Sequence, residues 1–139
     1  MSAIAHAAKA HWGYPAHWME RWREQLTITP EFISAHETFM AQVDRKIVGF
    51  YALLKTPESW RLEHLWVVPE QMGRGIGRSL FRGAAARAAA GGALCLTIEA
   101  DPNAEPFYKH MGAARAGVIR SEIDGRVREL PILRFDLTL

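Results

Sequence analysis

The fold is decided by residues 62–77, which have the sequence LEHLWVVPEQMGRGIG. The first half of this stretch is rich in the aliphatic, aromatic and β-branched residues that favour strands, and Pro69 ends the strand. Three glycines follow at alternate positions, and the alanine-rich segment after them has the composition of a helix. The stretch therefore predicts a strand over 60–68 that passes through a glycine-rich turn into a helix over 75–90.

A glycine-rich turn at the start of a helix is suited to binding an anion. Glycine adopts positive φ angles and lets the backbone approach a ligand closely, so that successive N–H groups can point at one phosphate. The helix N-terminus adds unpaired N–H donors and a partial positive charge. We therefore predict that this turn binds a phosphate group.

The charges around the turn favour the same interpretation. Arg74, Arg78 and Arg82 lie near the helix start, and residues 71–98 contain no carboxylate. A cation near a helix N-terminus is disfavoured by about 0.3–1 kcal/mol, and a bound anion would offset that cost. A basic face that is simply exposed to solvent is the alternative interpretation.

The glycine spacing separates this turn from two other phosphate-binding loops. It is not a Walker loop, because no Lys-Ser or Lys-Thr pair follows the glycines. It also differs from the dinucleotide fingerprint, because its glycines follow the pattern G-x-G-x-G and the chain is short for a two-lobed dinucleotide fold.

The rest of the chain predicts an α/β fold in one domain over residues 1–139. Helical spacing and helix-start residues predict helices over 6–13, 15–26, 31–35 and 102–110. Strands are expected over 38–43, 47–55, 60–68, 93–100, 115–122 and 127–137, with hairpin turns at 44–46 and 124–125. The apolar run over 93–100 follows a helix, which indicates a buried strand parallel to an earlier one. We expect a mixed, mostly antiparallel twisted sheet flanked by helices.

Composition restricts the partners and the compartment. The net charge is only +2, from 17 Lys and Arg against 15 Asp and Glu, which argues against nucleic acid as a partner. No apolar run reaches the roughly 20 residues of a membrane helix, so no membrane partner is expected. The single cysteine, Cys95, lies in an apolar run and fits a buried thiol in a reducing cytoplasm, where we place the protein. The six histidines show no zinc-ligand spacing, so we expect no metal.

Two motifs in the order found here resemble those of the GCN5-related N-acetyltransferase (GNAT) superfamily. The first is a strand, a glycine turn and a helix, matched by residues 72–77. The second is a strand, an asparagine and an aromatic-Tyr-x-x-x-Gly helix, matched by residues 94–100, Asn103 and residues 107–112. The resemblance covers roughly residues 60–112, and it implies an enzyme that transfers an acetyl group from acetyl-coenzyme A to an amine.

The resemblance also implies which residues bind coenzyme A. The pyrophosphate would lie against the turn and the residue after it, which are Gly73, Arg74, Gly75, Ile76, Gly77 and Arg78. The backbone of Val67 and Val68 would pair with the pantetheine arm and polarise the thioester carbonyl. Asn103 would bond to the pantetheine, Tyr108 would lie near the sulfur, and the cofactor would enter between the strands ending at Val68 and starting at Ala93.

Three alternatives are open for the catalytic base, since a primary amine with a pKa near 10.4 must lose a proton before it attacks. The family often places a carboxylate on the third strand, which favours Glu63. His64 has the better unperturbed pKa, but on a regular strand it shares a face with Leu62 and Trp66 and is then a core histidine. Neither residue, with a water relay instead, is the third alternative. Tyr108 is expected to act as the acid, with packing beside Phe107 as the structural alternative.

The acceptor is expected to be the primary amine of a small molecule. In this family the first helices and the last hairpin wall the acceptor pocket, and here the helices carry Trp12, Tyr14, His17, Trp18 and Trp22. These aromatic residues either line that pocket or belong to the core. A protein lysine, a protein N-terminus, aminoacyl-tRNA and a non-catalytic acyl-coenzyme A module are the alternatives to a small-molecule enzyme.

Two departures from the family pattern bear on these expectations. Met72 stands where the family usually has Arg or Gln, and a methionine side chain cannot donate a hydrogen bond. Family members also usually begin with a strand, whereas this chain is expected to start within the first helix. An upstream segment or a second copy in a homodimer would then cover the open sheet edge.

Overall fold

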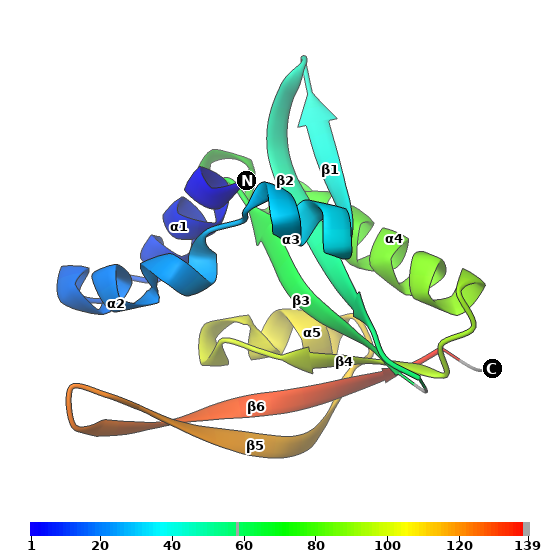
Figure 1. The fold of residues 1–139 in the computed structure, drawn as a ribbon. Helices are drawn as coiled ribbons and strands as arrows, with labels where there is room; N and C mark the ends of the chain where they lie inside the picture. Colours follow the sequence, from blue (N-terminus) through cyan, green and yellow to red (C-terminus); the bar gives the residue numbers. More distant parts are fainter. Residues whose placement is uncertain (58, 138–139) are drawn as a thin grey trace.

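A six-stranded mixed sheet forms the centre of the molecule, in the order β1-β2-β3-β4-β6-β5 (Figure 1). The computed structural model describes residues 1–57 and 59–137. The strands are β1 (Glu37–Val43), β2 (Lys46–Lys55), β3 (Ser59–Val67), β4 (Cys95–Glu99), β5 (Ala114–Ile123) and β6 (Arg126–Asp136). Only β3 and β4 pair in parallel, and the other neighbours are antiparallel. The predicted mixed, mostly antiparallel sheet is confirmed.

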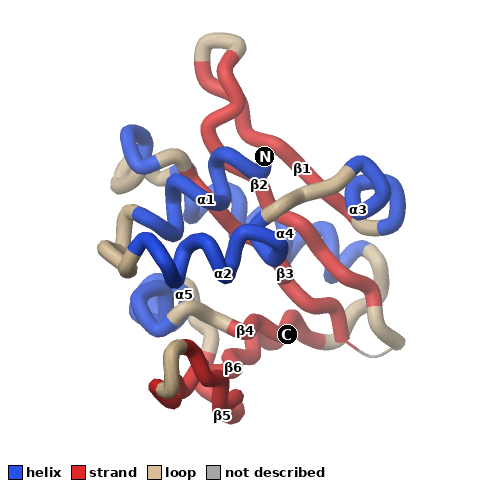
Figure 2. The backbone as a smooth tube through the Cα atoms, turned by 60° about the vertical axis from the view of Figure 1, so that its left-hand side comes forward, coloured by secondary structure: helices blue, strands red, loops and turns tan. Residues whose placement is uncertain are grey.

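Helices cover both faces of this sheet (Figure 2). They are α1 (Ser2–Ala10), α2 (Ala16–Leu26), α3 (Pro30–Ala35), η1 (Pro69–Gln71), α4 (Ile76–Ala90), η2 (Pro102–Ala104) and α5 (Glu105–His110). The first helix begins and ends earlier than predicted, and the helix predicted over 102–110 is a 3-10 turn followed by a short α-helix. In the described part of the chain, no helix is both long and apolar enough to cross a membrane.

Strand β2 has a core on each face because its side chains alternate. Tyr51 and Leu53 point into the larger core, where α4 contributes Leu80 and Phe81. Phe50 points the other way, into a smaller core formed with Met19, Leu26 and Ile28 from the N-terminal segment. The continuous buried run in β2 therefore follows from helices packing on both sides of the sheet. Cys95 is buried, as predicted.

Strand β3 contains a bulge at Glu63. Ala52 of β2 is opposite His64, and the next residue, Leu53, is opposite Leu62, so Glu63 is an extra residue in β3. A bulge shifts the alternation of side chains by one position. Leu62 therefore lies in the larger core and His64 on the opposite face, beside the smaller core. The expectation that these two residues share a face is wrong, because it assumed a regular strand.

Strands β3 and β4 separate soon after they pair. Their ladder joins Ser59 to Cys95, Trp60 to Leu96 and Arg61 to Thr97. Beyond these pairs, β3 continues along β2 to Val67, while β4 continues along β6 to Glu99. The gap that opens between the two strands lies on the same side as the glycine turn.

Candidate active site

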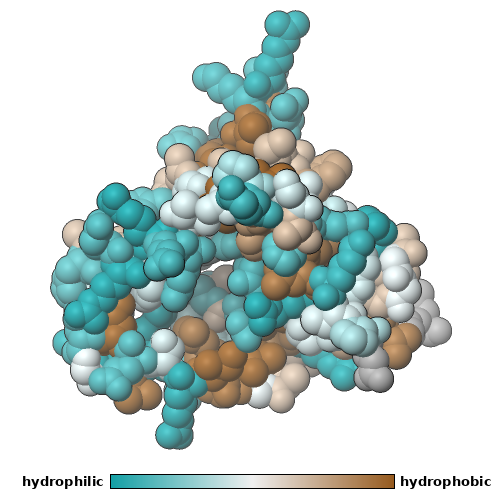
Figure 3. Space-filling view, in the orientation of Figure 1, coloured by the Kyte–Doolittle hydropathy of each residue, from teal (hydrophilic) through white to brown (hydrophobic). Residues whose placement is uncertain are grey.

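A cavity of about 470 Å³ lies where β3 and β4 separate. Leu65 and Val67 of β3 form one wall, Ile98 of β4 forms another, and Phe107 and Tyr108 of α5 close the end. Figure 3 shows a hollow in this region of the molecule, between the α1–α2 pair and the sheet, with apolar residues below it. The cavity volume of about 470 Å³ is in the range of small-molecule sites.

The glycine turn forms the outer end of this cavity. Gly73 and Gly75 have φ angles of 79° and 83°, which residues with a Cβ rarely adopt. Gly75 is the N-cap of α4, where no side chain caps the helix and no acidic residue lies in the first turn. Among the described residues, the N–H groups at this helix start are thus without a side-chain acceptor, and a Cβ on Gly73 or Gly75 would meet nothing within 4 Å.

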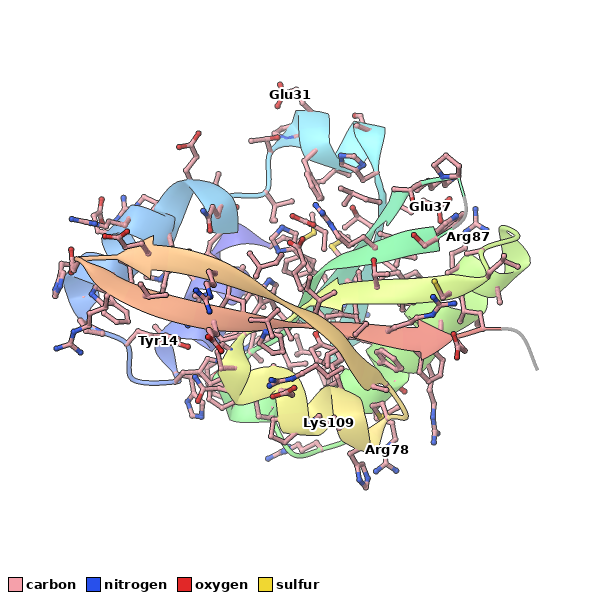
Figure 4. The ribbon with its side chains drawn as sticks, turned by 90° about the horizontal axis from the view of Figure 1, so that it is seen from below. Tyr14, Glu31, Glu37, Arg78, Arg87 and Lys109 are labelled. Atoms are coloured by element: carbon pink, nitrogen blue, oxygen red, sulfur yellow. The ribbon has the colours of Figure 1, made fainter. Side chains whose placement is uncertain are left out.

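The arginines at the two ends of α4 differ in their partners. Arg87, near the C-terminal end, forms an ion pair of 2.5 Å with Glu37, and Figure 4 shows the two side chains facing each other. Arg74, Arg78 and Arg82 are exposed, and within residues 1–57 and 59–137 none of them forms an ion pair. The start of α4 therefore concentrates positive charge beside the cavity, and Arg78 lies on the cavity wall.

Of the two backbone donors expected on β3, only Val67 is left for a ligand. The N–H of Val68 donates to the carbonyl of Val48 over 2.8 Å, so the sheet already uses it. Because N–H groups alternate in direction along an antiparallel strand, the N–H of Val67 points the other way, towards β4. There the strands have already separated, and Val67 lines the cavity.

Glu63 reaches the cavity from the bulge in β3. Its Oε2 accepts a hydrogen bond of 2.8 Å from Nε of Arg61 and forms an ion pair of 2.8 Å with Nη2 of the same guanidinium. The third nitrogen of that guanidinium, Nη1, lies 3.6 Å from Oε1 of Glu99 on β4. Arg61 thus joins two carboxylates across the separating strands, and it holds the Glu63 carboxylate through one oxygen.

His64 is a core histidine rather than a cavity residue. Its Nδ1 accepts a hydrogen bond of 2.9 Å from Nε1 of Trp66, and its ring packs against Phe32 and Phe50. Burial lowers the pKa of this imidazole, and the nearby charge of Glu63 opposes that effect only in part. His64 therefore stays neutral at neutral pH in an apolar environment.

Tyr108 and Asn103 both line the cavity, from α5 and η2. Tyr108 is buried, and its ring lies edge-on to Phe107. Burial, with a smaller contribution from the charge of Asp101, raises the pKa of the phenol well above its usual value, so it stays protonated. Nδ2 of Asn103 donates to the hydroxyl oxygen of Tyr14 over 2.9 Å and to Oδ1 of Asp101 over 3.1 Å.

A buried polar cluster beside the cavity was not predicted from the sequence. At its centre, Asp101 accepts a hydrogen bond of 2.9 Å from the Tyr14 hydroxyl and lies 3.3 Å from Nζ of Lys9. Arg128 of β6 donates to the same hydroxyl over 2.9 Å. One signal for Asp101 was present, because an aspartate directly before a proline is a common helix start. Its partners are distant in sequence, so no local pattern could reveal them.

The aromatic residues of the first two helices separate into two groups. Trp12 lies on the cavity wall. Tyr14, Trp18 and Trp22 instead surround the guanidinium of Arg128, at 5.0, 5.9 and 4.9 Å from their ring centres. His17 pairs with Asp124 at the turn of the last hairpin. Most of this group therefore joins the helices to the hairpin.

Most of the residues predicted for the site come together on this one cavity. The residues on its wall are Glu63, Val67, Gly73, Gly75, Gly77, Arg78, Asn103 and Tyr108. The three others lie next to it: Val68 is bound in the sheet, the Arg74 side chain is exposed, and Ile76 packs against the larger core. Met72 lies on the wall, where it offers an apolar surface.

Comparisons with known proteins agree with this architecture. The family model described as an acetyltransferase (GNAT) domain matches residues 3–122. A GCN5-related N-acetyltransferase from Rhodopseudomonas palustris, whose description also names a class-II aminotransferase, superposes with a TM-score of 0.79 at 26% identity, over 97% of this chain and 86% of that chain. No curated protein matches the sequence significantly.

Two further structures have the same fold at lower identity. The PaiA N-acetyltransferase of Thermoplasma acidophilum, solved with coenzyme A, has a TM-score of 0.75 and 19% identity over 97% of this chain and 89% of that chain. The ribosomal-protein-S18-alanine N-acetyltransferase of Escherichia coli has a TM-score of 0.72 and 18% identity over 99% of this chain and 86% of that chain.

The fold of this chain is thus the fold of these acetyltransferase structures. The family match covers most of the sequence, and the chain therefore belongs to the GNAT acetyltransferase family.

Proposed function

We propose that this protein transfers the acetyl group of acetyl-coenzyme A to a primary amine of a small molecule. The observation that carries the proposal is the continuity of one cavity, which runs from the glycine turn at the start of α4 to the carboxylates of Glu63 and Glu99. A phosphate-binding end and a carboxylate end are what a thioester donor and an amine acceptor require.

The outer end of the cavity supports coenzyme A as the donor. The N–H groups at the start of α4 and the side chain of Arg78 suit the pyrophosphate. The pantetheine arm would lie between Val67 and Asn103, and it carries the acetyl thioester. Met72 would make apolar contact in the place where a polar residue is usual in this family.

The inner end supports a small cationic acceptor. Trp12 and Trp66 give this end an aromatic wall, and Glu63 and Glu99 supply two carboxylates against one guanidinium. Aromatic faces and carboxylates both attract an ammonium group. A cavity of about 470 Å³ that also holds part of the donor leaves room for a small molecule rather than a large one.

We assign Glu63 the role of base, acting on the amine directly or through one water molecule. Arg61 holds its Oε2, which fixes the direction of the carboxylate and leaves Oε1 for the acceptor. The N–H of Val67 would stabilise negative charge on the thioester oxygen, a contribution worth about 3 kcal/mol at comparable sites. Tyr108, as a protonated phenol on the cavity wall, would donate a proton to the departing thiolate.

Calorimetric titration of the purified protein with acetyl-coenzyme A tests the donor site. We expect binding of acetyl-coenzyme A and of desulfo-coenzyme A and none of NADH, because the turn spacing suits the first two. A panel of small amines, followed by release of the free thiol, then tests the acceptor. Absence of acetyl-coenzyme A binding would contradict the proposal. Binding without turnover on small amines would point to a macromolecular acceptor or to a non-catalytic module.

A further inference from the structure

The polar cluster around Tyr14 reaches the donor side of the cavity through Asn103. Tyr14 comes from the loop between α1 and α2, and Figure 4 shows it beside the last hairpin. Asp101 and Asn103 come from the segment that follows β4. Tyr14 thus connects the N-terminal helices to Asn103, the residue expected to bind the pantetheine arm.

We propose that Tyr14 and Asp101 are positioning residues that hold the Asn103 amide with its nitrogen bound internally and its carbonyl oxygen turned to the cavity. There Oδ1 accepts a hydrogen bond from an amide N–H of the pantetheine arm. This inference rests on the proposed function, because it takes acetyl-coenzyme A as the ligand of the cavity.

The hydrogen bonds of Tyr14 leave only one orientation for the Asn103 amide. A phenol has a single proton, and Tyr14 gives it to the Asp101 carboxylate over 2.9 Å. Its oxygen must therefore accept from its other partners, which are Nη2 of Arg128 and Nδ2 of Asn103. A reversed amide would place Oδ1 of Asn103 against two acceptors, Tyr14 Oη and Asp101 Oδ1, with no proton between them.

The surroundings of Tyr14 keep this arrangement intact at neutral pH. Burial, followed by the charge of Asp101 and the hydrogen bond to it, raises the pKa of Tyr14 to about 12, so the phenol remains a donor. The Asp101 side chain is only 7% exposed, and Lys9 and Arg128 provide positive charge around it. Asp101 also accepts from the backbone N–H of Asn103 over 2.9 Å, which fixes the start of η2.

Both N–H groups of the Asn103 amide are consumed by these bonds, so the residue can offer a ligand only its oxygen. A pantetheine arm contains two amide N–H groups that can meet such an acceptor. The arrangement therefore predicts that Tyr14 affects binding of the pantetheine arm and has no effect on binding of the adenosine phosphates.

The test is calorimetric titration of four proteins: the wild type, Tyr14→Phe, Asn103→Ala and the double variant. The ligands are acetyl-coenzyme A and adenosine 3′,5′-bisphosphate, which carries phosphates but no pantetheine. We expect Tyr14→Phe to weaken acetyl-coenzyme A by about three- to tenfold, the size of one hydrogen bond, and to leave the bisphosphate unchanged. In the Asn103→Ala background, Tyr14→Phe should have no further effect, because its action passes through that residue.

Trp18→Phe is the matched control. Nε1 of Trp18 donates to Asp124 over 2.7 Å, so this variant removes a hydrogen bond between the N-terminal helices and the hairpin without touching Asn103. We expect it to leave both affinities unchanged. Bisphosphate binding reports that each variant is folded.

The inference would be overturned by equal weakening of both ligands by Tyr14→Phe, by the same loss in the Asn103→Ala background, or by the same loss from Trp18→Phe. A wild type that binds acetyl-coenzyme A, with Tyr14→Phe unchanged, would overturn this inference alone. A wild type that does not bind acetyl-coenzyme A would overturn the proposed function and this inference together.

Discussion

Two regions beside the cavity, the glycine turn and the polar cluster that contacts Asn103, are built in different ways. At the glycine turn, the conformation comes from neighbouring residues: Gly73 and Gly75 supply positive φ angles, and α4 supplies N–H groups. At the polar cluster, Tyr14 and Asp101 meet across 87 positions of sequence. Arg74, Arg78 and Arg82 beside the turn form no ion pair within the described residues, whereas the charges of the cluster are paired with one another. The comparison indicates that the phosphate-binding end of the proposed donor site depends on local backbone conformation, whereas the Asn103 side of that site depends on long-range side-chain contacts.

The largest expected effect is on the free energy of unfolding, and it distinguishes Asp101 from Asp124, the two aspartates that join the N-terminal helices to the rest of the chain. Asp101 pairs with Lys9 and Arg128, whose side chains are 15% and 14% exposed. Asp101→Ala leaves those two cations without their carboxylate and should cost about 3 kcal/mol of unfolding free energy. Asp124 contacts His17 and Arg21, both largely exposed, so Asp124→Ala should cost about 1 kcal/mol or less. Urea denaturation measures both, and equal losses would contradict a structural role for the buried cluster.

The next effect concerns the two carboxylates at the end of the cavity opposite the glycine turn. Glu63→Gln keeps the shape of the side chain but removes the proposed base, so kcat should fall about 100-fold or more on any amine that the wild type accepts. Glu99→Gln changes the other carboxylate that contacts Arg61 and should lower kcat by less than about tenfold. Steady-state assays of the two variants measure these losses in kcat. Similar losses in both variants would show that the carboxylates act together through their charge and that Glu63 is not a specific base.

A smaller effect tests the local character of the donor end. Gly75 and Gly92 lie at opposite ends of α4, both have positive φ, and a Cβ on either would meet nothing within 4 Å. Gly75→Ala and Gly92→Ala should therefore each cost about 1–2 kcal/mol of stability. Only Gly75→Ala should also weaken acetyl-coenzyme A, by about tenfold, because it disturbs the N–H groups of the turn. Calorimetric titration measures the affinity of both variants for acetyl-coenzyme A. Equal affinities would contradict the assignment of the turn as the phosphate-binding site.

The smallest effect is a pH dependence of stability that arises from His64. Burial lowers its pKa in the folded protein, so between that value and the unfolded value near 6.5 the unfolded chain binds more protons. Stability contributed by neutral His64 is therefore fully present above pH 6.5 and is lost as the pH falls from there through the lower pKa of the folded protein. His64→Gln removes this contribution, so its stability should fall less steeply between pH 7.5 and 5. Parallel curves from urea denaturation would show that His64 is exposed to water.

The sequence was sufficient for the fold and for the conformation of the glycine turn, because both depend on local patterns. Strand and helix periods, the turn at Asp124 and Gly125, and the glycine spacing are contained in short segments. The bulge at Glu63 was missed because it depends on how β3 pairs with β2, and it reversed the face assigned to His64. The cluster of Tyr14, Asp101 and Arg128 was missed because three distant segments form it, and their aromatic neighbours were compatible with either a pocket or a core.

Because β3 and β4 separate early, binding of the proposed donor is also expected to stabilise the protein against degradation. Three residue pairs join the two halves of the sheet, so a ligand that bonds to both halves binds the folded chain and not the unfolded one. At a donor concentration 100 times the Kd, such a ligand adds about 2.7 kcal/mol to the free energy of unfolding. Because proteases degrade the unfolded fraction, we expect the cellular abundance of the protein to rise and fall with the supply of acetyl-coenzyme A.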